Sequence, residues 1–166
     1  MSYRMDWGAV AAQLPQLAKG FLFTVEITLT AYACALVLGL LVALCRLSPW
    51  RPLSILAFAY TQFFRAISIY IYIIWIYFGL PMALGINLSP FAASVLSITL
   101  LHSAYMSEIY RSAIVSVSAG QREAARSLGL GRLSVFLDVV LPQAMAVALP
   151  QLVIHSSMIV KDSSVV

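Results

Sequence analysis

Long apolar stretches alternate with short polar connections along this chain, and the pattern predicts a bundle of membrane-spanning helices. A helix needs about 20 predominantly apolar residues to cross the hydrocarbon layer of a bilayer. Residues 20–45, 53–80 and 88–109 meet this length, and a shorter apolar stretch covers residues 144–160. The pattern therefore predicts an all-α integral membrane fold with about four transmembrane helices.

Polar side chains interrupt the first half of the second stretch, where Thr61, Gln62 and Arg65 fall. A charged group that faces hydrocarbon is costly. We therefore expect the spanning part of this stretch to begin near Ile67, with the preceding turns amphipathic or packed against other helices.

The first 19 residues predict a separate segment that lies at the membrane surface. Their apolar side chains recur at steps of three and four, as on one stripe of an interfacial helix: Trp7, Val10, Leu14 and Leu17. Pro15 interrupts this helix, and the features of a signal peptide are missing. The chain thus divides into an N-terminal interfacial segment over residues 1–19 and a transmembrane domain over residues 20–166.

The composition agrees with a membrane protein and argues against a soluble one. Hydrophobic residues make up 62% of the 166 residues, charged residues only 10%, and the mean hydropathy is +0.95. A soluble domain carries about 25% charged residues. The net charge of +4 comes from scattered basic residues, which suit topological anchors better than a nucleic-acid surface. Cys34 and Cys45 lie three turns apart in one span, which excludes a disulfide and leaves a packing role.

The distribution of arginines predicts the orientation. The connection over residues 46–52 carries two arginines, the one over 81–87 carries none, and the one over 111–142 carries four. Cytoplasmic connections are enriched in Lys and Arg, so the first and third connections lie inside and the N-terminus outside. The last residues, 161–166, offer no basic stop, and we expect the chain to be cut short there.

The third connection predicts two short helices. Residues 121–128 form the first, with Ser118 as its cap and Gly129 as the left-handed residue that ends it. Residues 131–141 form the second, which Pro142 stops.

The first of these helices has the composition of a docking surface for a soluble partner. Ala124, Ala125 and Leu128 form a small apolar face, while Arg122 and Arg126 lie four residues apart on a charged one. Small residues permit close approach of a partner, and charges orient it. The alternative interpretation is a solvated loop whose arginines only fix the topology.

The same segment resembles the EAA loop of bacterial ABC-importer permeases. That motif reads EAA, three residues, Gly, nine residues, Ile, one residue and Leu-Pro. The chain matches the spacing throughout, with Val in place of Ile: Glu123, Ala124, Ala125, Gly129, Val139, Leu141 and Pro142. Three flanking stretches are similar to the polar amino-acid uptake permeases, the group that contains the histidine and glutamine permeases: residues 77–81, 108–114 and 161–164. The resemblance extends from about Gly20 to the end.

The resemblance implies a division of labour among several subunits. The EAA loop is a coupling helix that sits in a cleft of a separate ATPase. Glu123 would make the polar contact to the ATPase, and Ala124 and Ala125 would allow its close approach. Gly129 would form the turn between the two short helices. Arg122 and Arg126 would supply the charges around this contact. ATP and Mg²⁺ would be bound by the ATPase, because the chain has no Gly-x-x-x-x-Gly-Lys-Ser/Thr. The chain itself would be neither an enzyme nor the carrier of a cofactor.

The remaining expected partners are a second permease, a periplasmic solute-binding protein and membrane lipid, all at the bacterial inner membrane. The resemblance implies import of a polar amino acid or related zwitterionic solute by alternating access. Intact members have a fifth span. The alternatives are a membrane scaffold, a secondary transporter that needs no ATPase, and an inactive, truncated permease.

One departure from the family concerns the solute path. Members commonly carry Arg-Gly-Thr-Pro-Leu-Leu-Val-Gln where this chain has residues 65–72, so Gly, Pro and Gln have no counterparts. Candidate path residues are nevertheless found here and on the last span: Arg65, Tyr70, Tyr72, Trp75 and Ser156. Tyr77 extends the aromatic cluster, which suits a cationic or zwitterionic solute but also an interfacial belt or helix packing. Arg65 also suits a snorkelling anchor.

We expect different interactions for two pairs of polar residues in the third stretch. His102 and Glu108 lie six residues apart, which does not place them on one helix face, so we expect no metal site or proton relay between them. Glu108 and Arg111 lie three apart and predict a local ion pair.

Overall fold

The computed structural model describes residues 7–164, and the side chains of residues 13–164. All regular elements of this part of the chain are helices, which confirms the all-α prediction. The elements in order are α1 (Trp7–Arg46), α2 (Arg51–Ala66), α3 (Ile69–Ile74), η1 (Trp75–Gly79), α4 (Leu80–Leu84), α5 (Pro90–Ser116), α6 (Ala119–Ser127), α7 (Arg132–Ser134), η2 (Val135–Val140) and α8 (Leu141–Ser163). The two η elements are π-helical turns within longer helices.

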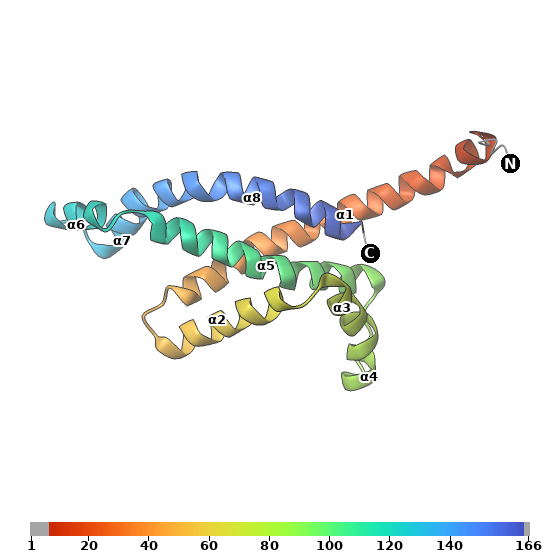
Figure 1. Ribbon diagram of the computed structural model, residues 1–166, viewed down its shortest axis with the longest axis horizontal. Coiled ribbons are helices and arrows are strands. Elements are labelled where there is room, and N and C mark those ends of the chain that lie inside the picture. Colours follow the sequence, from red (N-terminus) through yellow and green to blue (C-terminus); the bar gives the residue numbers. More distant parts are fainter. Residues whose placement is uncertain (1–6, 165–166) are drawn as a thin grey trace.

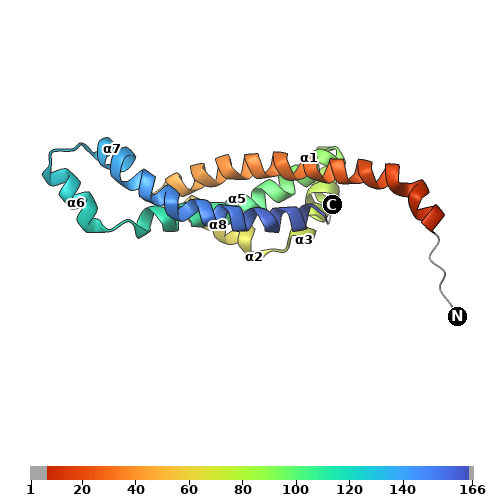
Figure 2. The same ribbon diagram turned by 90° about the horizontal axis from the view of Figure 1, so that it is seen from above.

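Helix α5 is the centre of the bundle. It packs against α1 and α8 along the long axis of the molecule, with α2 beside it (Figures 1 and 2). The arm formed by α3, η1 and α4 leaves the bundle steeply, because the chain bends by 102° after α2. α6 and α7 lie beyond the bundle at the end opposite the N-terminus.

Small side chains bring α1 and α5 close together. Ala31, Ala35 and Ala43 of α1 are fully buried. A Cβ on Gly39 would lie 2.8 Å from Cβ of Met106 and 3.0 Å from the carbonyl oxygen of Ser103. Small residues at such an interface allow close approach of helix backbones, which gains van der Waals contact where lipid offers no hydrophobic driving force.

Buried hydroxyl groups help to make α5 less apolar than α1. Four serines donate to carbonyl groups three or four residues earlier in the same helix, at 2.6 to 3.0 Å: Ser94, Ser97, Ser103 and Ser107. Within the described residues, the helices long and apolar enough to cross a membrane are Gln13–Arg46 and Arg132–Ser163, with the bent pair Arg51–Ala66 and Ile69–Leu84 as a third. α5 occupies the predicted third stretch and is shielded by these helices.

Helix α1 is continuous across Pro15 and across the predicted boundary between residues 19 and 20. α1 continues from Trp7 through Pro15 to Arg46, so no loop separates residues 13–19 from the first span. An internal proline removes one backbone hydrogen bond and bends a helix without having to end it. Pro15 is exposed, and its surroundings leave room for the ring. The side chains of Trp7 and Val10, half of the predicted stripe, lie outside the described residues.

The prediction that Pro142 stops a helix is wrong. The helix runs through Pro142 from Arg132 to Ser163. The wider π-helical turn η2 makes room for the proline ring, and the amide of Leu141 donates to the carbonyl of Phe136, five residues back. The same arrangement precedes Pro81, where the amide after η1 donates to the carbonyl of Trp75. Each Leu-Pro step follows a turn that has already widened.

The second predicted span, residues 53–80, is two helices with a sharp corner. Ile67 and Ser68 have extended backbone, with ψ of 142° and 147°, between α2 and α3. The corner coincides with the predicted start of the spanning part near Ile67. It forms although the chain lacks the Gly and Pro that would have signalled it.

Candidate functional site

The predicted coupling helix exists as α6 and is capped at both ends. The hydroxyl of Ser118 accepts a hydrogen bond from the amide of Gln121 at 3.4 Å. At the other end Gly129 has φ of +82°, a left-handed conformation that favours glycine. The amide of Leu128 donates to Ala124, and that of Leu130 to Ala125, at 3.2 and 3.3 Å. Both sequence-predicted caps are therefore confirmed.

The apolar residues of α6 divide between two faces. Leu128 is 83% exposed, and Glu123 and Ala124 are exposed beside it. Ala125 is only 6% exposed, because α6 packs on η2 on that side. The predicted shared face of Ala124, Ala125 and Leu128 is therefore wrong: one alanine faces outward and the other anchors the helix.

The two arginines of α6 also differ in their surroundings. Arg122 is half-buried and its guanidinium donates to the carbonyl of Ile114, near the C-terminal end of α5. Such end carbonyls lack partners within their own helix, so a basic side chain can satisfy them. Arg126 is exposed. One arginine thus ties α6 to α5, while the other is open to a partner.

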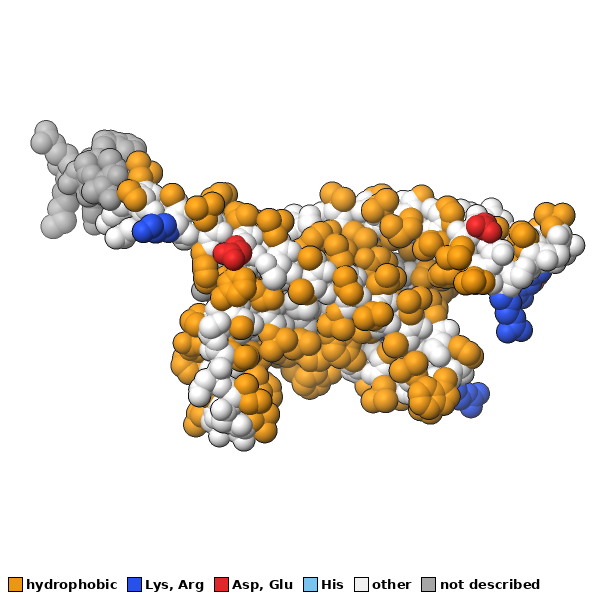
Figure 3. Space-filling model, turned by 180° about the vertical axis from the view of Figure 1, so that it is seen from behind, with side chains coloured by type: hydrophobic (Ala, Val, Ile, Leu, Met, Phe, Trp, Pro, Cys, Tyr) orange, Lys and Arg blue, Asp and Glu red, His pale blue; other side chains and the backbone are white. Residues whose placement is uncertain are grey.

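Charge and apolar surface separate along the molecule. Figure 3 shows hydrophobic side chains over the middle of the bundle and Lys and Arg side chains gathered at the end that carries α6. The pattern matches an apolar belt between two aqueous faces, one of which is richer in positive charge.

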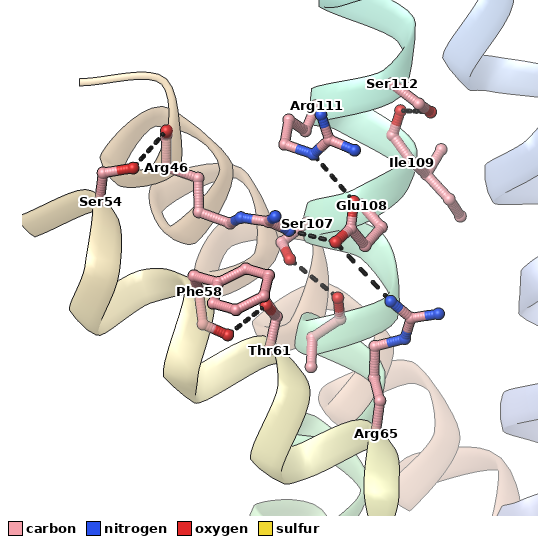
Figure 4. Close-up of polar contacts among 11 residues, drawn as sticks. Arg46, Ser54, Phe58, Thr61, Arg65, Ser107, Glu108, Ile109, Arg111 and Ser112 are labelled. Carbon is pink, nitrogen blue, oxygen red and sulfur yellow. Dashed lines mark hydrogen bonds and ion pairs between the residues drawn. The ribbon is translucent and has the colours of Figure 1, made fainter. Parts of the chain in front are cut away.

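An ion-pair cluster joins α1, α2 and α5 near this end (Figure 4). The carboxylate of Glu108 pairs with Arg46, the last residue of α1, and with Arg111, whose Nε lies 2.9 Å from Oε2. Nη1 of Arg65 approaches Oε1 to 3.7 Å, and its guanidinium lies over the ring of Tyr105 at 5.1 Å. The predicted pair of Glu108 and Arg111 is confirmed, and two further arginines join it.

Of the aromatic path candidates, Tyr72 and Trp75 line an apolar cavity of about 470 Å³, and Tyr70 does not. Tyr72 is buried, stacks on Phe64 and donates through its hydroxyl to the carbonyl of Phe63 at 3.1 Å. Tyr70 and Trp75 are more than half exposed on the arm. The hydroxyl of Ser156, on α8, donates to its own helix.

A polar cavity of about 490 Å³ lies instead between the α2–α3 corner, α5 and α8. Its lining includes Ser68, Tyr105, Lys161 and three side chains that are hydrogen-bonded to one another. Nδ1 of His102 lies 3.0 Å from Nε2 of His155, and Nε2 of His102 lies 3.0 Å from Oδ2 of Asp162.

Sequence reasoning missed this cluster because it considered His102 only with Glu108. The two residues do point apart, since Glu108 faces α1 and α2 while His102 faces α8. The sequence signal that could have indicated this cluster is the spacing of His155 and Asp162. Seven residues are two helical turns, which places both side chains on one face of the last span.

The comparison with protein families decides what this bundle is. Residues 35–166 match the family described as binding-protein-dependent transport system inner membrane component. The chain belongs to this permease family. The match includes α2, the arm, α5, α6 and α8, and so contains every feature described above except the first part of α1.

Individual relatives support the same family assignment. The permease is 34% identical to the arginine transport system permease protein ArtQ of Bacillus subtilis, over 98% of this chain and 74% of the relative. It is 39% identical to the probable glutamine ABC transporter permease protein GlnM of the same organism, over 88% of this chain and 67% of the relative. It is 32% identical to the glutamate/aspartate import permease protein GltK of Escherichia coli, over 99% of this chain and 76% of the relative.

A solved structure supports the same assignment. The permease superposes on a chain of an amino acid ABC transporter crystallised with histidines, with a TM-score of 0.90 and 31% identity. The match covers 98% of this chain and 76% of the other. The chain therefore has the fold of an ABC-importer permease, a class of transport subunit that is not itself an enzyme, and it spans about three quarters of the length of several relatives.

Proposed function

We propose that the permease forms the membrane pathway of an ABC importer for a polar amino acid or related zwitterionic solute. A separate ATPase would bind ATP and Mg²⁺, a second permease would complete the pathway, and a periplasmic solute-binding protein would deliver the solute. The names of the relatives, which include arginine, glutamine and glutamate/aspartate transport, favour such an importer over a scaffold or a secondary transporter.

The observation that carries this proposal is the exposure of a capped helix outside the bundle. We infer that Glu123, Ala124, Arg126 and Leu128 contact the ATPase, because all four side chains are exposed on α6 or directly after it. An exposed leucine beside an alanine and two charges suits a partner with a small apolar pocket and a polar rim. Helix α6 has nine residues, too few to be stable alone in water, so its order depends on its attachments.

The attachments of α6 suggest how movement would pass into the membrane. Arg122 fixes it to the end of α5, and Ala125 fixes it to η2, which continues into α8. Gly129 turns the chain after α6, on the way to η2. Displacement of α6 by an ATPase would therefore move α5 and α8, the helices that line the polar cavity, as a unit.

We assign the solute path to the polar cavity at the α2–α3 corner. Irregular backbone within a membrane occurs where it lines a cavity or is buried in protein, and discontinuous helices commonly form transporter sites. Of the sequence candidates, Arg65 approaches this cavity through its stacking on Tyr105. Tyr70, Tyr72, Trp75 and Ser156 lie outside its lining.

The proposed orientation places α6 and the Glu108 cluster in the cytoplasm and the N-terminus of α1 outside, in a multi-pass protein of the inner membrane. The four arginines of residues 111–142 support it, since export of that segment would oppose the positive-inside rule. Exposed leucine, isoleucine and phenylalanine side chains along α1 and α2 would face lipid.

Co-purification with the ATPase tests the proposal. The permease is isolated from native membranes, and the accompanying subunits are identified by mass spectrometry and assayed for ATP hydrolysis in proteoliposomes. Glu123→Ala and Ala124→Arg should release the ATPase, because they remove a polar contact and block close approach. Gln121→Ala, an exposed residue on the same helix, is the matched control and should retain it. ATP-independent uptake by a preparation without ATPase would instead establish a secondary transporter.

A further inference from the structure

The Glu108 cluster contains more positive than negative charge. Three guanidinium groups, those of Arg46, Arg65 and Arg111, share one carboxylate. Among the described residues, Glu108 is the only acidic partner within 4 Å of any of them. Two positive charges therefore remain uncompensated in a partly buried place, where an unpaired charge is more costly than in bulk water. Such a surplus favours an anionic ligand.

A groove beside this cluster has the shape and lining for the ligand. It encloses about 320 Å³ between the α1–α2 turn and α5. Arg46, Arg111 and Ser54 form its polar part. Leu47, Ile55 and Phe58 form its apolar part, and all three are partly exposed. The groove thus presents positive charge and apolar surface to the same occupant.

The guanidinium of Arg111 is oriented so that it can bind further. Its Nε donates to Glu108, and among the described residues neither of its terminal nitrogens has an acceptor. Arg46 is held more tightly: it pairs with Glu108, lies over the ring of Phe58 at 5.3 Å, and its carbonyl accepts from Ser54. Arg46 is therefore a fixed charge at the base of the groove, and Arg111 supplies the open donors.

We propose that this groove binds the phosphate of an anionic glycerophospholipid, with the first carbons of an acyl chain against Ile55 and Phe58. The proposed orientation, on which this inference rests, places the groove at the cytoplasmic leaflet, where anionic lipids attract basic segments. Trp50 and Arg51 are exposed on the adjoining turn, as expected of residues at the headgroup level. A lipid bound here would contact α1, α2 and α5 together.

Native mass spectrometry of the full chain with its co-purified subunits tests the lipid site. The complex is titrated with phosphatidylglycerol and with phosphatidylcholine of the same acyl chains. We expect phosphatidylglycerol to be retained preferentially, and Arg111→Gln to weaken its apparent affinity about tenfold, the effect of losing one hydrogen bond to a charged group. Arg132→Gln makes the same change of charge at an exposed residue outside the groove and should leave the affinity unchanged.

Further measurements on the unaltered protein keep the inference falsifiable if Arg111→Gln fails to fold. Millimolar inorganic phosphate should not displace the lipid, because it lacks the acyl chain. Displacement by phosphate would reveal an anion site without lipid preference and overturn the proposal, as would equal retention of both lipids. If preferential retention disappears whenever the ATPase is present, the groove belongs to a protein interface, and the lipid proposal is wrong.

The two proposals fail separately. Equal retention of both lipids by a permease that still carries its ATPase rejects the lipid site and leaves the importer function standing. Preferential retention by a permease that carries no ATPase rejects the coupling function and leaves the lipid site.

Discussion

Nε2 of His102 on α5 lies 3.0 Å from Oδ2 of Asp162 on α8, and this contact joins two helices through residues 60 positions apart. A carboxylate can only accept, so Nε2 donates to Asp162, and Nδ1 of a neutral ring accepts from His155. The histidine ring is 2% exposed and could not replace these partners with water. The chain of three side chains therefore sets the register of α5 against α8.

Asp162→Leu should destabilise the permease by about 1–3 kcal/mol, because it leaves a buried donor of His102 without an acceptor. Asp162→Asn keeps an acceptor oxygen in the same place and should lower the free energy of unfolding by less than half as much as Asp162→Leu. The free energy of unfolding in detergent measures both. Equal losses for the two variants would mean that the side chain contributes through its volume or charge and not through this hydrogen bond.

Glu108→Ala should lower the free energy of unfolding by about 2 kcal/mol. The carboxylate is 23% exposed. The loss of its ion pairs should therefore cost more stability than the loss of a surface pair and less than the loss of one partner of a fully buried pair. Three arginines from three helices would also be left facing one another. Glu26→Ala is the matched control, since Glu26 is an exposed carboxylate on α1, and it should change stability by less than about 0.5 kcal/mol. Equal effects would exclude a stabilising role for the cluster.

The local features of the fold could be predicted from sequence because their causes are local. Apolar stretches of helical length located the four helical regions, although not their ends. Ser118 and Gly129 marked both ends of α6 because capping depends on residues within one turn. The EAA spacing could be recognised for the same reason, since all of its positions lie within twenty residues.

The features that sequence reasoning missed depend on packing between distant segments. The corner at Ile67 and Ser68 carries no Gly or Pro, and it exists because α2 and the arm pack against different parts of α5. The partners Arg46 and Glu108 are 62 residues apart. The inward orientation of Ala125 follows from η2, whose widened turn has no recognised residue pattern.

Gly20 and Gly39 of α1 should respond in opposite directions to the same substitution. Gly39→Ala places a Cβ 2.8 Å from Met106 and 3.0 Å from a backbone oxygen of α5, which cannot rotate away. We expect a loss of about 1–3 kcal/mol from overpacking. Gly20→Ala meets nothing within 4 Å and should raise stability by about 0.5–1 kcal/mol through the better helix propensity of alanine. Thermal unfolding in detergent compares them, and a neutral Gly39→Ala would mean that α1 and α5 can separate freely.

Gly129 supplies the left-handed residue of the turn that ends α6. Gly129→Ala meets no steric neighbour, yet φ of +82° is unfavourable for alanine by about 1–2 kcal/mol. The amides of Leu128 and Leu130, which close this turn, should then exchange with solvent about 5- to 30-fold faster. Gly131→Ala is the matched control two residues away, because φ of −66° suits alanine. Hydrogen exchange measures both variants. If protection of these amides is unchanged in Gly129→Ala, the turn does not depend on glycine, and its part in holding α6 in place is refuted.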